Sequence, residues 1–226
     1  MNISIERIDR TMLQEVRYTG LPPKDKLVKI AALYANAFAD PPWNEYKVCK
    51  KGHYSGKEFA DLTKCTTCNE LLELAYPEDQ TVDYISNEIG KPNGTLITFE
   101  DQRTGEVYAA GWGYTCTIEE LKTKYKTTEM KEKVEVAIKK TALNADKIFY
   151  LSETMVDSCV RKQGIATQIF DGLLKRTNEL GLKMVMRTHN QSPMVGIAEK
   201  KAMTRIINEG QDSEIQDRVL YIAIAK

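Results

Sequence analysis

The sequence predicts a domain of the α/β (α+β) class, in which helices flank a β-sheet. Two observations support this prediction. Helical apolar patterns alternate with short β-type runs along the chain, and two neighbouring β-type runs are joined by a segment typical of a hairpin turn. At 226 residues the chain is long enough to bury a sizeable core within one domain.

The first part of the chain predicts one strand and two helices. Residues 1–7 alternate like a strand, and residues 25–39 follow a helical pattern that the pair Pro41 and Pro42 stops. A second helix is expected over residues 77–90. The apolar face of the first helix comprises Leu27, Ile30, Ala31, Tyr34 and Phe38.

The middle of the chain predicts a hairpin followed by helical structure. Residues 95–99 and 107–113 are β-type runs, and residues 101–105 between them have the composition of a turn. Residues 118–143 are highly charged and have a thin apolar stripe, which predicts an outer helix or a pair of helices.

The last part of the chain alternates strands and helices. The expected helices cover residues 163–180 and 192–202, the first of them stopped by Gly181. The expected strands cover residues 148–156, 182–188, 203–208 and 218–225.

Composition narrows the function classes. The 32 basic and 32 acidic side chains give a formal net charge of zero, which gives little support to a nucleic acid partner. No run approaches the ~20 apolar residues of a membrane span, and the first residues lack the apolar core of a signal peptide. We therefore expect a cytoplasmic protein without a membrane partner. Neither a P-loop nor a Gly-x-Gly-x-x-Gly turn occurs, which argues against nucleotide phosphate transfer.

The segment 160–167 lies between an expected strand and an expected helix. The first N–H groups of a helix have no partner within the helix and carry partial positive charge, so this turn can bind a diphosphate. Gly164 has no side chain to obstruct the approach of an anion, and Ala166 has only a small one. The alternative is an ordinary helix start.

The pattern Arg161-x-x-Gly164-x-Ala166 resembles the coenzyme A signature of the GNAT superfamily of N-acetyltransferases. The order of the expected strands and helices is similar to that of the whole family fold. The resemblance implies a mostly antiparallel mixed sheet, a strand that splays from its neighbour, and acetyl-CoA as cosubstrate. The coenzyme contacts that it implies are Met155, Val156, Arg161, Lys162, Gln163, Gly164, Ile165, Ala166, Thr167 and Asn190. For Asn190, a plain capping or turn role is the alternative.

Four potential metal ligands lie within 20 residues, as Cys49-x3-His53 followed by Cys65-x2-Cys68. Three cysteines and one histidine form a known closed zinc set, so a structural Zn²⁺ is expected in a small zinc-ribbon-like insertion over residues 45–75. A redox pair at Cys65 and Cys68, or four residues without a metal, are the alternatives.

Glu153 is the candidate general base, because many family members carry an acidic residue at this position of the strand. An alkylamine with a pKa of ~10.4 is rarely neutral at pH 7, so a base would help the reaction. A salt-bridged surface glutamate is the alternative. The tyrosine that serves many relatives as general acid has no counterpart here, and Tyr114 and Tyr221 remain unranked candidates.

The loop around Pro42, Trp43 and Glu45 resembles a motif that borders the acceptor site in a subset of the family. Trp43 and Glu45 are therefore candidates for a cationic amine pocket, while Trp43 as a core anchor is the alternative. For His189 we favour a structural role.

Together these observations predict one GNAT-like domain over residues 1–226 that transfers an acetyl group from acetyl-CoA directly to a primary amine. The acceptor is a small-molecule or peptide amine, and the sequence leaves a homodimer open. The alternative function is a zinc-ribbon-containing binding or acyl-CoA-sensing module without turnover. Another acyl donor or an alcohol acceptor also stays open.

Overall fold

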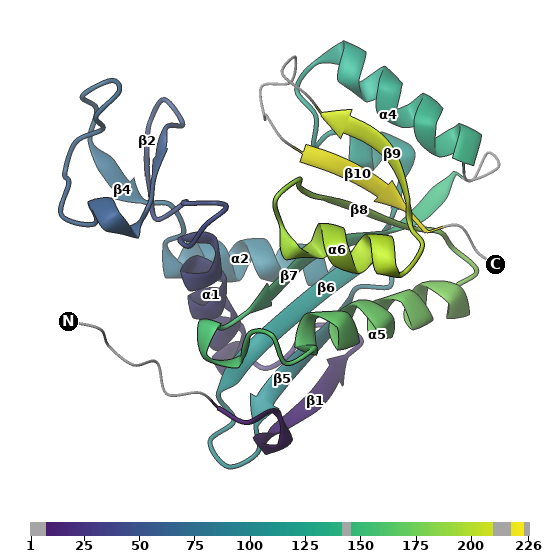
Figure 1. Ribbon diagram of the computed structural model, residues 1–226, viewed down its shortest axis with the longest axis horizontal. Helices are drawn as coiled ribbons and strands as arrows, with labels where there is room; N and C mark the ends of the chain where they lie inside the picture. Colours follow the sequence, from purple (N-terminus) through teal and green to yellow (C-terminus); the bar gives the residue numbers. More distant parts are fainter. Residues whose placement is uncertain (1–7, 142–145, 210–217, 224–226) are drawn as a thin grey trace.

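The computed structural model describes residues 8–141, 146–209 and 218–223, and its centre is a seven-stranded mixed sheet (Figure 1). Every neighbouring pair of strands is antiparallel except β7 and β8, which are parallel, so the predicted fold class is confirmed. In their order across the sheet the strands are β1 (Leu13–Tyr18), β5 (Thr95–Asp101), β6 (Val107–Thr117), β7 (Lys147–Val156), β8 (Met184–His189), β10 (Arg218–Ile222) and β9 (Thr204–Glu209).

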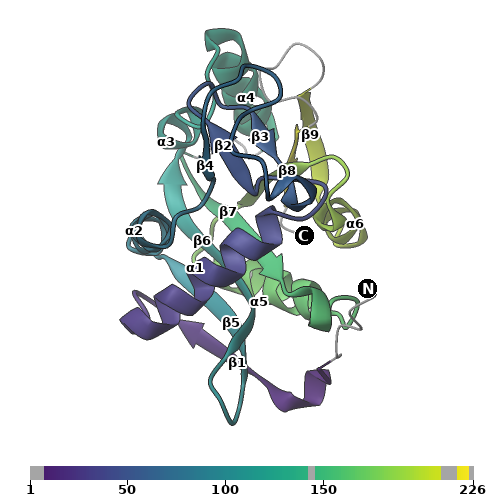
Figure 2. The ribbon, with the colours of Figure 1, turned by 90° about the vertical axis from the view of Figure 1, so that its left-hand side faces the viewer.

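Helices cover both faces of this sheet (Figures 1 and 2). One face packs against α1 (Lys24–Phe38), α2 (Glu78–Ile89), α3 (Ile118–Lys122) and α4 (Thr128–Thr141). The other face packs against α5 (Ile165–Glu179) and α6 (Pro193–Lys200). Side chains alternate between the faces along each strand, so Trp112 of β6 joins the core under α1 while Ala109 joins the core under α5.

A small antiparallel sheet lies between α1 and α2 in the chain and projects from the main body (Figure 1). Its strands are β3 (Tyr54–Ser55), β2 (Lys47–Cys49) and β4 (Leu72–Leu74), in that order. Several of its large apolar side chains are exposed, namely Tyr54, Phe59, Leu71 and Leu74. The projecting sheet therefore has little apolar core of its own.

Most predicted elements are present, and two predictions need comment. The helical segment expected over 118–143 is a pair, α3 and α4, and α3 begins with a capping box between Thr117 and Glu120. The strand β1 is not predicted, because Leu13, Val16 and Tyr18 do not alternate strictly with polar residues. The strand expected over 1–7 lies outside the described residues. No helix in the described ranges is long and apolar enough to cross a bilayer.

The sheet opens between β7 and β8, as the family resemblance implies. These strands pair only from Phe149 to Leu151, whereas β7 continues to Val156. On its other side, the register between β6 and β7 shifts so that Ser152 has no residue opposite it. Such a bulge bends a strand and redirects the side chains that follow it. The chain after Leu151 therefore leaves β8, and a gap forms.

Candidate functional site

The turn after β7 leaves the first turn of α5 without a side-chain cap. Gly164 is the residue before the helix, and its φ of 78° lies in the left-handed region that favours glycine. Lys162 also has a positive φ, of 66°. No side chain bonds the first amides of α5, so the N–H groups of Ile165 and Ala166 are available to an anion.

A cavity of about 390 Å³ opens onto this turn. Its walls include eight of the ten residues expected to contact the coenzyme, namely Met155, Val156, Arg161, Lys162, Gly164, Ile165, Ala166 and Thr167. Gln163 and Asn190 are absent from its walls. We call this cavity the coenzyme groove.

The side chain of Gln163 holds the segment before β1 instead. Its Oε1 accepts a hydrogen bond from the Arg10 backbone N–H at 2.9 Å, and its Nε2 donates to the Ile8 carbonyl at 2.8 Å. Arg161 has one guanidinium nitrogen 3.1 Å from an Asp40 carboxylate oxygen and donates to the Val156 carbonyl at 3.0 Å. Both side chains therefore stabilise the surroundings of the turn.

A second cavity, of about 410 Å³, lies at the opening between β7 and β8. We call it the acceptor cavity. Both Trp43 and Glu45 line it. The residues that it shares with the coenzyme groove are Phe38, Trp43, Thr154, Ser192 and Met194. Since the two cavities have common walls, a ligand in one lies next to a ligand in the other.

Glu153 lies in the wall of the acceptor cavity and is partly buried. Its Oε1 accepts a hydrogen bond from the Tyr84 hydroxyl at 3.1 Å and lies 3.5 Å from the Tyr34 hydroxyl. Burial raises the pKa of Glu153 to about 7, and the hydrogen bond from Tyr84 opposes this rise. A carboxyl group with a pKa in this range can accept or release a proton near neutral pH.

The backbone of β7 presents an amide to the gap. The Asp157 N–H donates to the Tyr108 carbonyl of β6. Because amide groups alternate sides along a strand, the N–H of Val156 points away from β6, toward the side that β8 has left. Of the two coenzyme contacts expected on this strand, Met155 and Val156, the register therefore favours Val156 as the one whose backbone N–H faces the gap.

The remaining candidates have structural partners. The hydroxyl of Tyr114 donates to Glu88, and that of Tyr221 donates to Glu199 while accepting from Arg205. Neither tyrosine is in the wall of the acceptor cavity. The His189 ring packs edge-on against Trp43 at 5.8 Å, and its Nδ1 accepts from the Gln191 N–H.

Sequence reasoning missed Tyr34, Tyr84 and Arg218, all of which surround the acceptor cavity or its carboxyl group. Tyr34 belongs to the apolar face of α1, and this pattern carries no sign of its hydroxyl contact. Arg218 is the first residue of β10, where a charged residue at a strand end attracts no attention.

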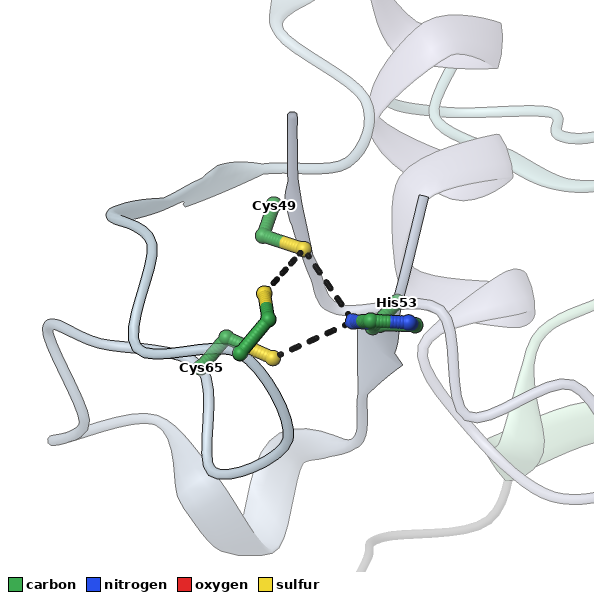
Figure 3. A group of neighbouring side chains, drawn as sticks. Cys49, His53 and Cys65 are labelled. Atoms are coloured by element: carbon green, nitrogen blue, oxygen red, sulfur yellow. Dashed lines mark hydrogen bonds between the residues drawn. The ribbon is translucent and has the colours of Figure 1, made fainter. Parts of the chain in front are cut away.

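Two tight turns bring Cys49, His53, Cys65 and Cys68 together in the projecting sheet. Figure 3 shows Cys49, His53 and Cys65 pointing toward one another. Cys49 Sγ lies 3.6 Å from His53 Nδ1 and 3.6 Å from Cys68 Sγ, and Cys65 Sγ also lies 3.6 Å from His53 Nδ1. All four ligand atoms lie within 4.8 Å of one another.

These distances suit a tetrahedral ion. With Zn–S bonds of ~2.3 Å, neighbouring sulfur ligands of a tetrahedron lie about 3.8 Å apart, close to the observed separations. The Thr67 N–H also points to Cys65 Sγ at 3.4 Å, a contact that favours the thiolate. A Cys3His group that can hold a metal is therefore present.

No family model matches the chain, and no curated protein matches it in sequence. Its fold resembles solved N-acetyltransferases. Arylalkylamine N-acetyltransferase 2 from Aedes aegypti is 13% identical, with a TM-score of 0.54 over 94% of this chain and 100% of that one. Arabidopsis thaliana NAA60, solved with a bisubstrate analogue, is 9% identical, with a TM-score of 0.54 over 94% and 100%. The NatC complex bound to Gag peptide and CoA is 11% identical, with a TM-score of 0.51 over 94% and 99%. These likenesses establish the fold.

Proposed function

We propose that this protein is an acetyl-CoA-dependent N-acetyltransferase that transfers the acetyl group directly to a primary amine. The observation that carries the proposal is the pair of adjoining cavities. One lies against uncapped helix amides and the other contains a carboxyl group with a pKa near 7. The fold shared with N-acetyltransferases supports the same function.

Acetyl-CoA would supply the acetyl group and a thiolate leaving group with a pKa near ~8.5. In the proposed reaction the amine nitrogen forms a bond to the acetyl carbon, the carbon–sulfur bond breaks, and the amine proton passes to Glu153. The N–H of Val156 stabilises the negative charge that develops on the acetyl oxygen. The amides of Gly164, Ile165, Ala166 and Thr167 hold the diphosphate.

We also propose that Cys49, His53, Cys65 and Cys68 bind one structural Zn²⁺. All four ligands come from the protein, so no position remains for a reacting water. The metal would fasten residues 45–75, whose exposed apolar side chains show how little core this insertion has.

Calorimetry with acetyl-CoA and two variants at one position tests the coenzyme proposal. Gly164→Asp adds a negative charge at the turn, whereas Gly164→Asn adds a side chain of the same size without charge and tolerates a positive φ. We expect wild type to bind, Gly164→Asn to bind more weakly, and Gly164→Asp to bind at least tenfold more weakly than Gly164→Asn. Equal affinity of the two variants would refute an anion site here.

Turnover is tested separately by thiol release from acetyl-CoA with a panel of primary amines. Release that depends on an amine supports the enzyme. Coenzyme binding without release for any amine would instead favour an acyl-CoA-sensing module.

A further inference from the structure

The acceptor cavity contains a guanidinium group that no described carboxylate approaches to ion-pair distance, although Glu45 and Glu153 are near enough to act on its charge. Arg218 lines this cavity and is partly buried, and its guanidinium carbon lies 4.2 Å from the centre of the Trp43 ring. Its Nε is buried and has no hydrogen-bond partner within the described ranges. Among the residues that the structure describes, no carboxylate forms an ion pair with Arg218.

The other charged groups of the cavity are already engaged. Lys124 lies 3.7 Å from a Glu88 carboxylate oxygen and 5.0 Å from the centre of the Tyr150 ring. Arg187 lies over the Tyr125 ring at 4.8 Å. The carboxyl groups of the cavity accept hydrogen bonds from tyrosines, Glu45 from Tyr76 and Glu153 from Tyr84.

The two carboxyl groups of this cavity are weak counter-ions for Arg218. The cavity walls carry three cationic side chains, Lys124, Arg187 and Arg218, against two carboxyl groups, Glu45 and Glu153. Burial raises the pKa of both carboxyl groups, that of Glu153 to about 7, which disfavours their charged forms. Burial and the nearby charge of Arg187 lower the pKa of Arg218, and the opposing effect of Glu45 and Glu153 does not offset them.

A guanidinium group positioned over an indole ring suits a carboxylate. Its N–H groups match the two carboxylate oxygens, and the contact with Trp43 restricts where the group can lie. A ligand carboxylate would supply a directly hydrogen-bonded counter-ion and satisfy the buried Nε donor. Glu153 lies in the wall of the same cavity, next to the coenzyme groove.

We propose that the acceptor is a small amino carboxylate, an amino acid or a close relative, whose carboxylate binds Arg218 while its amine faces Glu153. This inference rests on the proposed acetyl transfer and specifies its substrate class. It predicts discrimination against amines of the same skeleton that lack a carboxylate.

Matched acceptors test the inference. Each amino acid of a panel is compared with its primary amide and with its decarboxylated amine, for example leucine, leucinamide and isoamylamine. We expect wild type to show a kcat/KM at least tenfold higher for the amino acids that it accepts than for their amides. Arg218→Gln should lower kcat/KM for amino acids about ten- to hundredfold, the range for hydrogen bonds to a charged group, and should leave the amides nearly unchanged. Arg218→Lys keeps the charge and should lose less.

Arg103→Gln is the control, because Arg103 is an exposed arginine outside the cavity. Two results would overturn the carboxylate inference while leaving the proposed acetyltransferase intact. One is a kcat/KM for amides or decarboxylated amines equal to that for amino acids, and the other is an equal loss of kcat/KM for all acceptors in Arg218→Gln. If no amine is turned over, the proposed function fails, and calorimetry with the same amino acids and amides in the presence of CoA decides the binding question. Binding of amino acids that Arg218→Gln loses supports the carboxylate site, and no such binding overturns it.

Discussion

Replacing Glu153 with glutamine should make the protein more stable and less active. In the folded chain the pKa of Glu153 is raised by burial to about 7, from an ordinary value of 4.5. Between pH 4.5 and 7 the unfolded chain has already released this proton while the folded chain still holds it. The free energy of unfolding of wild type therefore falls as the pH rises through this window and levels off above pH 7.

The size of the effect follows from this difference. At about 1.36 kcal/mol for each unit of pKa, the rise from 4.5 to about 7 corresponds to an upper limit of about 3 kcal/mol at pH 8. A glutamine at this position keeps the shape of the side chain and carries no charge, so the variant escapes this cost. At pH 4.5 both proteins carry a neutral side chain, and their stabilities should nearly coincide.

Urea unfolding of wild type and Glu153→Gln, at several values between pH 4.5 and 8, measures the difference. Glu132→Gln, at an exposed position of α4, is the control and should change little at any pH. In the same preparations kcat should fall by about 10²–10⁴, the usual contribution of a general base. A stability difference that stays constant from pH 5 to 8 would refute the assignment of a raised pKa to Glu153.

Three further changes test other parts of the structure. Tyr84→Phe removes a hydrogen bond that lowers the pKa of Glu153, so the rising limb of the kcat profile should move to higher pH, and an unmoved limb would contradict the contact. Cys65→Ser, or a strong chelator, should remove about one zinc per chain, which elemental analysis measures, and should speed hydrogen exchange within residues 45–75. A metal-free wild type would refute the site. Gly111→Ala places a Cβ 2.5 Å from Ile169 Cγ2 and should lower the melting temperature, at a cost of about 1–3 kcal/mol, whereas Gly196→Ala meets open space and should stabilise α6 slightly.

The parts of the site that sequence reasoning found are local in the chain. The turn at Gly164 and the cysteine pairs depend on residues a few positions apart, whose chemistry is readable without the fold. The helices and the hairpin follow from periodicity in the same way, and the mixed sheet was implied by the family resemblance. One local inference was incomplete, because Gln163 has the expected place in the turn but uses its side chain to bind Ile8 and Arg10.

The acceptor cavity depends on contacts between distant parts of the chain. Tyr34 and Tyr84 come from different helices and meet Glu153, which is 119 and 69 residues away from them. Which way Glu153 points is decided by the bulge at Ser152, and a bulge depends on the pairing partner as much as on the strand itself. Arg218 reaches the acceptor cavity only because β10 pairs with β8, and this pairing cannot be read from the residues around Arg218.

The two ends of the projecting insertion over residues 45–75 meet. The Ala75 N–H donates to the Tyr46 carbonyl at 3.0 Å, and just outside this pair the Tyr76 hydroxyl bonds Glu45. A stretch that leaves and returns at one place can be exchanged for a shorter or longer one without moving α1 or α2. Replacing residues 47–74 with a two-residue linker should therefore leave the main sheet and its helices in place. Because Tyr54 lines the acceptor cavity, the shortened protein would also measure how much the insertion contributes to the wall of that cavity.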